Sequence, residues 1–128
     1  MLDVTDDNSV KNAIQTVCDD AGRIDVLVNN AGYALSGAFE DISLSEIRKQ
    51  YETNVYGLIR TIQAVLPIMR TQKSGLIVNI SSGAGRFGHP TGSAYVSTKF
   101  AVEGLSESMS YELEPFGIKN SNYRARCD

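Results

Sequence analysis

The sequence predicts an α/β protein built on a partial doubly wound parallel sheet with helices on both faces. Short apolar runs rich in β-branched residues alternate along the chain with longer segments whose apolar residues recur at helical spacing. Strands separated by helices of this length pair in parallel through right-handed crossovers. The chain has 128 residues, which suits one small domain. We therefore expect residues 1–128 to form a single domain.

Composition and charge exclude several classes of partner. The formal net charge is −3, the isoelectric point is near 5.1, and no basic stripe is visible, which argues against nucleic acid and anionic membranes. The two cysteines, Cys18 and Cys127, are far apart and fit no metal or redox spacing, so we expect no metal site. No apolar run is long enough to span a membrane, and the acidic start does not resemble a signal peptide. We expect a cytoplasmic protein.

The first elements are a strand end, a helix and a strand. Leu2 to Val4 is predicted to be the end of a strand. Capping residues at 6–9 then precede an apolar stripe at helical spacing, and Gly22 is placed to end that helix. The stripe comprises Val10, Ala13, Ile14, Val17, Cys18 and Ala21. The short run Ile24 to Val28 is typical of a strand that is covered on both faces.

A long helical pattern begins at Ser43. Glu46 stands three residues later, which is the signature of a capping box, and the apolar stripe continues to Met69. Gly57 and Pro67 predict a bend or an early end within this segment.

The last elements are a strand, a helix and the start of a strand. Leu76 to Ile80 is a second buried strand. A helix follows whose apolar face includes Phe100, Leu105, Met109 and Leu113. Gly117 closes this helix and Ile118 begins another strand, although the residues that follow, NSNYRARCD, lack the expected apolar run.

Tyr95 and Lys99 suggest chemistry because they are four residues apart on one helix face. A neighbouring ammonium lowers the pKa of a phenol, which is otherwise near 10. Ser82 follows the preceding strand, so its hydroxyl can reach the same point. Such a site could bind and protonate a carbonyl oxygen during hydride transfer from a nicotinamide cofactor. The Tyr-x-x-x-Lys pair alone is weak evidence, because most such pairs are surface contacts.

Four motifs in order resemble the classical short-chain dehydrogenase/reductase family, from Asp3 through about Lys119. They are Asn-Asn-Ala-Gly at 29–32 after a strand, Asn54 in TNVYG, the serines that end IVNISS, and the Tyr-x-x-x-Lys at 95–99. Ser82, rather than Ser81, stands thirteen residues before Tyr95, which is the separation usual in the family.

The resemblance implies a fold, a reaction and a role for each matching residue. The fold would be a Rossmann-like NAD(P)-binding domain, present from the end of its third strand to the start of its sixth. The reaction would interconvert a secondary alcohol and a ketone with NAD or NADP. In it Tyr95 would be the general acid/base, Lys99 would lower the pKa of Tyr95 and bind the nicotinamide ribose, and Ser82 would orient the substrate. Asn54 would hold a water of the proton relay.

The family's cofactor contacts and assembly can be carried over in the same way. Asp3 and Val4 would contact the adenine, and Asn30, Ala31 and Gly32 would line the ribose side of the cofactor. The helices at Ser43 to Met69 and Ser93 to Glu114 would form the contacts of a homo-dimer or homo-tetramer in the parent protein.

The sequence also departs from the family pattern. It contains no Thr-Gly-x-x-x-Gly-x-Gly turn, which would bind the cofactor pyrophosphate, and residues 120–128 do not continue the family's substrate loop. In the family the first two strands lie between the third and fourth, so without them we expect Leu2 to Val4 to be left without a neighbouring strand and Ile24 to Val28 to form an exposed apolar edge. We therefore expect a fragment of a longer dehydrogenase.

Two alternatives remain open. The chain could be a non-catalytic remnant that associates only through its long helices. A hydrolase using Ser82 with Lys99 or His89 is disfavoured by the absence of a Gly-x-Ser-x-Gly elbow.

Overall fold

A three-stranded parallel sheet forms the centre of the molecule. The computed structural model describes residues 1–82 and 85–124. The strands β1 (Val26–Asn29), β2 (Gly75–Ser81) and β3 (Ile118–Arg124) lie in the order β1-β2-β3. Both neighbouring pairs are parallel. The α/β class and the parallel sheet are therefore confirmed.

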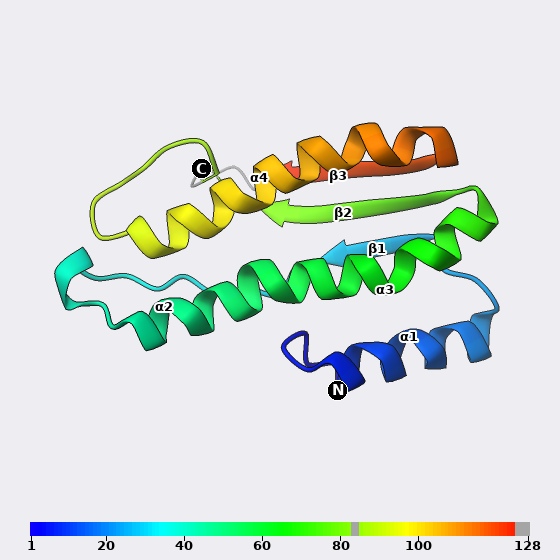
Figure 1. Cartoon of the computed structure of the whole chain (residues 1–128), viewed down its shortest axis with the longest axis horizontal. Helices are drawn as coiled ribbons and strands as arrows, with labels where there is room; N and C mark the ends of the chain where they lie inside the picture. Colours follow the sequence, from blue (N-terminus) through cyan, green and yellow to red (C-terminus); the bar gives the residue numbers. More distant parts are fainter. Residues whose placement is uncertain (83–84, 125–128) are drawn as a thin grey trace.

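Three long helices cover one face of this sheet (Figure 1). They are α1 (Asp7–Ala21), α3 (Gly57–Gln72) and α4 (Ser93–Leu113). Apolar residues of α3, α4 and the strands form one core with Ile24, which lies before β1, and Ile14 and Cys18 of α1 pack against it. The buried members are Ile24, Leu58, Ile62, Val65, Met69, Ile77, Val102, Leu113 and Ile118. Two short 3-10 turns, η1 (Phe39–Asp41) and η4 (Glu114–Phe116), complete the connections. No helix in the described residues is both long enough and apolar enough to cross a membrane.

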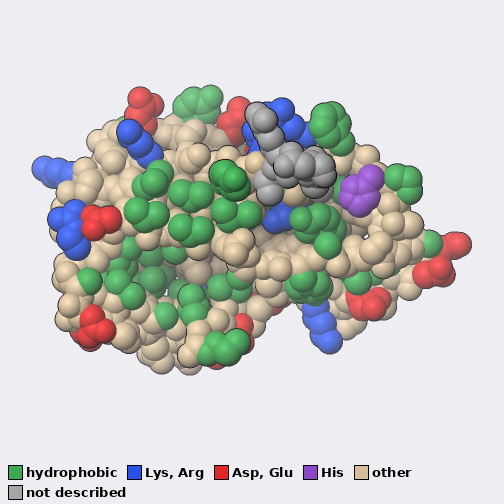
Figure 2. Space-filling view, turned by 180° about the vertical axis from the view of Figure 1, so that it is seen from behind, with side chains coloured by type: hydrophobic (Ala, Val, Ile, Leu, Met, Phe, Trp, Pro, Cys, Tyr) green, Lys and Arg blue, Asp and Glu red, His purple; other side chains and the backbone are tan. Residues whose placement is uncertain are grey.

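Helices on both faces were predicted, but the helices described here cover only one face. The chain moves along the sheet in one direction, and right-handed crossovers made in one direction place their helices on the same side. Figure 2 views the molecule from behind and shows hydrophobic side chains gathered on the opposite face. Val26 and Val28 of the edge strand β1 are 53% and 55% exposed. The expectation of an exposed apolar edge at residues 24–28 is thus confirmed for these two valines, and the expectation that this strand is covered on both faces is not.

Leu2 to Val4 do not form the predicted strand end, but within the described residues they lie without a neighbouring strand, as expected. These residues form an irregular lead into a turn, with the Asp3 carboxylate accepting hydrogen bonds from the backbone N–H and hydroxyl of Thr5. In the described part of the chain β1 pairs only with β2, so residues 2–4 have no strand beside them. The following helix is as predicted: Asp6 caps α1, and Gly22 ends it in the left-handed conformation.

The long helical segment after Ser43 is continuous but changes its winding in the middle. The capping box of Ser43 and Glu46 opens α2 (Leu44–Tyr51), as predicted. A π-helical turn, η2 (Glu52–Tyr56), joins α2 to α3, and the N–H of Gly57 bonds to the carbonyl of Glu52. Pro67 lies inside α3. The irregularity predicted at Gly57 or Pro67 is therefore a π turn immediately before Gly57.

Strand β3 lacks the apolar run that was expected at its position. Polar side chains on its inner face form hydrogen bonds with β2 and α4 instead. Asn120, Asn122 and Arg124 alternate with exposed residues and face α4 and β2. We call this set the polar seam: Asn79, Glu103, Ser106, Asn120, Asn122 and Arg124. Asn79 donates to Ser106 Oγ and to Asn120 Oδ1, both at 3.0 Å.

The apolar face predicted for helix α4 is wrong at one residue. Leu105, Met109 and Leu113 of α4 are buried or half-buried in the hydrophobic core, but Phe100 is 47% exposed. Phe100 therefore lies outside the core.

Candidate active site

The end of β2 and the first turns of α4 meet at one point (Figure 1). Ser82 directly follows β2, and Tyr95 lies in the first turn of α4. The Tyr95 hydroxyl donates to the Ser82 hydroxyl at 3.4 Å. Ser81 points elsewhere, with its hydroxyl bonded to Glu103 at 2.8 Å. Two hydroxyls from separate elements therefore face the same volume.

Lys99 lies one turn further along α4, on the same side as Tyr95. Its Nζ is 5.6 Å from the centre of the Tyr95 ring and donates to the carbonyl of Ile80 at 3.3 Å. Burial lowers the pKa of Lys99, and the negative charge of Glu103 partly opposes that effect. A half-buried ammonium beside a phenol is thus fixed by a backbone carbonyl of β2.

A cleft of about 290 Å³ opens beside these groups. Its walls come from the loop after β1, the end of β2 and the start of α4, and its lining comprises Asn30, Gly32, Tyr33, Ala34, Ile80, Ser81, Tyr95 and Lys99. Of the residues predicted to bind a cofactor, Asn30, Gly32, Tyr95 and Lys99 are thus brought together. Ala31 is exposed and does not line the cleft, and neither do Asp3 and Val4, which lie before α1.

Asn54 holds the loop after β1 against this site. It is 3% exposed and sits in the π turn η2. Its Oδ1 accepts from the N–H of Tyr33, while its Nδ2 donates to the carbonyl of Tyr33 and to the hydroxyl of Thr98 on α4. A side chain at Gly32 would place its Cβ 3.1 Å from Asn54 Oδ1. The described contacts of the Asn54 amide therefore position the cleft wall, and its predicted part in a proton relay stays a prediction.

Comparison with known proteins identifies the family. The family described as short chain dehydrogenase matches residues 1–123. This chain belongs to it. Oxidoreductase BOA17 of Botryotinia fuckeliana is 49% identical over 118 residues, which are 92% of this chain and 43% of that protein. The 3-ketodihydrosphingosine reductase of Bacteroides thetaiotaomicron is 44% identical over 119 residues, 93% of this chain and 44% of that protein.

The solved structures agree with this assignment. ElxO with NADP bound superimposes with a TM-score of 0.90 at 38% identity, covering 94% of this chain and 49% of that one. This family member thus spans about half the length of the relatives it matches. The resemblance seen in the sequence is confirmed, and so is the Rossmann-like architecture.

The part of a nicotinamide cofactor that the cleft could receive is its ribose end. A lysine ammonium carries three donors, and one of those of Lys99 bonds to Ile80. The ammonium and the side chain of Asn30 supply polar groups suited to ribose hydroxyls. Within the part of the chain that the structure describes, the loop after β1 leads into the 3-10 turn η1, so this loop offers the pyrophosphate no α-helix N-terminus. The residues fit one end of the cofactor.

Two residues near the site of this short-chain dehydrogenase, Gln50 and Glu103, were not predicted from the sequence. Gln50 is fully buried, and its Nε2 donates to the carbonyl of Tyr33 at 2.8 Å, beside the bonds from Asn54. Its spacing of four before Asn54 was a usable signal, because both then share a helix face. Glu103, four after Lys99, carried the same signal.

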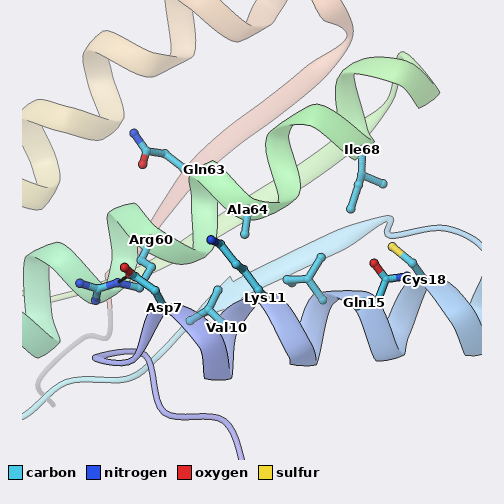
Figure 3. A pocket seen from close by; sticks show the side chains of 10 residues that line it. Asp7, Val10, Lys11, Gln15, Cys18, Arg60, Gln63, Ala64 and Ile68 are labelled. Atoms are coloured by element: carbon cyan, nitrogen blue, oxygen red, sulfur yellow. Dashed lines mark hydrogen bonds and ion pairs between the residues drawn. The ribbon is translucent and has the colours of Figure 1, made fainter.

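A larger hollow of about 610 Å³ lies between α1 and α3 (Figure 3). Lys11 and Cys18 line it, and Arg60 bonds there to Asp7, and to Glu52 at 2.8 Å. It contains none of the groups that meet at the end of β2. In the described ranges, no group of three or more His, Cys, Asp or Glu side chains could hold a metal ion.

Proposed function

We propose that this chain is the catalytic part of an NAD(P)-dependent oxidoreductase that interconverts a secondary alcohol and a ketone. The observation that carries the proposal is the 3.4 Å contact between the hydroxyls of Tyr95 and Ser82, beside a cleft that Tyr95 and Lys99 line. Family membership supports it, as do relatives that are named oxidoreductases and a solved neighbour that binds NADP.

Each residue has a part that follows from its contacts. The Ser82 hydroxyl donates to the substrate oxygen and orients it. Tyr95 gives its phenolic proton to that oxygen in reduction and takes it back in oxidation. Lys99 stabilises the phenolate with its positive charge and offers donors to the nicotinamide ribose. The cofactor, when bound, supplies or accepts the hydride.

Asn54, Gln50 and Gly32 act on the cleft indirectly. The first two fix the main chain of Tyr33, and Gly32 leaves room for the Asn54 amide. We place a relay water beside Asn54, and the adenine near Asp3 and Val4, as parts of the same proposal. Ala31 belongs to it as the link between Asn30 and Gly32.

The setting of the enzyme is also proposed. Residues 1–128 would form part of one nucleotide-binding domain, working in the cytoplasm on small alcohols and ketones. A ketone on a lipid chain is one candidate class, since a relative is a 3-ketodihydrosphingosine reductase. Association of copies through α2, α3 and α4 would give a dimer or tetramer.

Turnover of the variant Tyr95→Phe tests the proposal. We expect the oxidation of NADPH or NADH by a ketone substrate to be abolished, because the ring remains and only the proton donor is lost. Tyr111→Phe is the matched control, since Tyr111 is an exposed tyrosine of the same helix. Circular dichroism should show both variants folded. Full turnover in Tyr95→Phe would contradict the role given to Tyr95.

A further inference from the structure

We propose that Glu103 is a positioning residue of this site, which ties the end of β2 to α4 and sets a negative charge toward Lys99. The proposal rests on the function proposed above. Glu103 lies one turn beyond Lys99, so Tyr95, Lys99 and Glu103 form a row on one face of α4.

Three consecutive residues at the end of β2 are each held by one member of this row. The Ile80 carbonyl accepts from Lys99 at 3.3 Å, and the Ser81 hydroxyl donates to Glu103 at 2.8 Å. Ser82 accepts from Tyr95 at 3.4 Å. Ser81 is buried, and its hydroxyl has the shortest of the three bonds. Fixing Ser81 therefore fixes the place from which the Ser82 hydroxyl reaches Tyr95.

The Glu103 carboxylate is itself strongly held. Its side chain is 15% exposed, and Arg124 of β3 binds it through two nitrogens, at 3.0 and 2.8 Å. Asn122 donates to it at 2.9 Å. Fork-like binding of a carboxylate by arginine is both strong and directional. Glu103 thus joins β2, β3 and α4 at one point beside the cleft.

Glu103 also acts on Lys99 by its charge. Among the described residues, the groups found near that ammonium include Tyr95 and Glu103 on α4, the Ile80 carbonyl on β2, and Asn30 and Tyr33 from the loop after β1. Arg124 forms an ion pair with Glu103 at 2.8 Å. Burial lowers the pKa of Lys99, and Glu103 is the acidic group that opposes this. Glu103 therefore helps to keep Lys99 charged.

Lysine side-chain NMR of the whole chain tests the proposal without requiring turnover. The titration of the Lys99 ammonium is followed by carbon–nitrogen correlation and assigned by its loss in Lys99→Arg. In Glu103→Gln we expect the pKa of Lys99 to fall. In Arg124→Gln we expect it to rise, because the carboxylate is then less neutralised. Glu107→Gln, an exposed residue one turn further on, should leave it unchanged.

Shifts of opposite sign in the two variants support the proposal, because a residue that only stabilises the fold would not produce them. Identical Lys99 titration in all variants would overturn it. If Glu103→Gln does not fold, Arg124→Gln alone decides, and an unchanged pKa of Lys99 in Arg124→Gln would also overturn the proposal. Where turnover is measured, Glu103→Gln should lower kcat by about 10- to 100-fold with little change in KM. Failure of the proposed function would appear instead as turnover retained in Tyr95→Phe.

Discussion

Replacing Asn79 by leucine should destabilise the protein strongly. Asn79 is fully buried at the centre of the sheet, where it accepts from Asn29 Nδ2 at 2.9 Å and donates to Ser106 and Asn120 at 3.0 Å. Leucine branches at the same atom but is larger and has no polar atom. The substitution leaves Asn29 Nδ2 and Asn120 Oδ1 without these partners in a partly buried region.

The cost follows from those two groups. An unsatisfied buried donor or acceptor costs about 1–3 kcal/mol, so for the two groups we expect a loss of about 2–6 kcal/mol in the free energy of unfolding. That is a large part of the stability of an ordinary domain, which is about 5–15 kcal/mol. Urea unfolding followed by circular dichroism measures the difference. Asn12→Leu on the exposed side of α1 is the matched control and should change stability by no more than about 0.5 kcal/mol. A loss below about 0.5 kcal/mol for Asn79→Leu would refute the reasoning.

Three further predictions concern stability. Gly117→Ala should lower the unfolding free energy by at least about 1 kcal/mol, because Gly117 has φ +73° and a Cβ there would lie 2.5 Å from the Lys73 carbonyl oxygen. Gly104→Ala should instead raise it by about 0.5–1 kcal/mol, because Gly104 lies on a helix with open space around it. Thermal unfolding of the two variants checks both predictions. Burial raises the pKa of Glu103, but hydrogen bonds from its partners outweigh burial and hold that pKa below its ordinary value of 4.5. Its contribution to stability is thus present above pH 4.5 and lost as the pH falls through the folded-state pKa, so Glu103→Gln should flatten acid unfolding curves there. Val28→Lys should change the unfolding free energy by less than about 0.5 kcal/mol, since the side chain is mostly exposed; a larger loss would show that this face is covered.

Much of the fold could be predicted because apolar spacing reports burial directly. The stripes of α1, α3 and α4 and the run in β2 were visible, and the capping box at Ser43 fixed the start of α2. The strand at Leu2 to Val4 failed for the opposite reason, since strand formation depends on a neighbouring strand as well as on composition. Strand β3 was hard to foresee because its inner face is satisfied by hydrogen bonds, and no periodicity of apolar residues reports that.

Some contacts of the candidate site could be predicted from the sequence and others could not. The spacing of Tyr95, Lys99 and Ser82 was enough to predict that they would meet, because helix and strand geometry fix it. The contacts of Asn54 and Gln50 with Tyr33 depend on how a loop folds back, which local sequence does not encode.

The π turn at Glu52–Tyr56 accommodates one residue more than an α-helical turn does. Its wider winding takes up that residue locally, so the helix continues on either side of it as α2 and α3. Asn54 lies inside this turn, and from there its amide reaches the main chain of Tyr33 and the hydroxyl of Thr98. Removing one residue would restore regular winding and shift the Asn54 amide although every side chain of the cleft was still encoded. The position of that amide is therefore set by a residue count as well as by the identity of the residue.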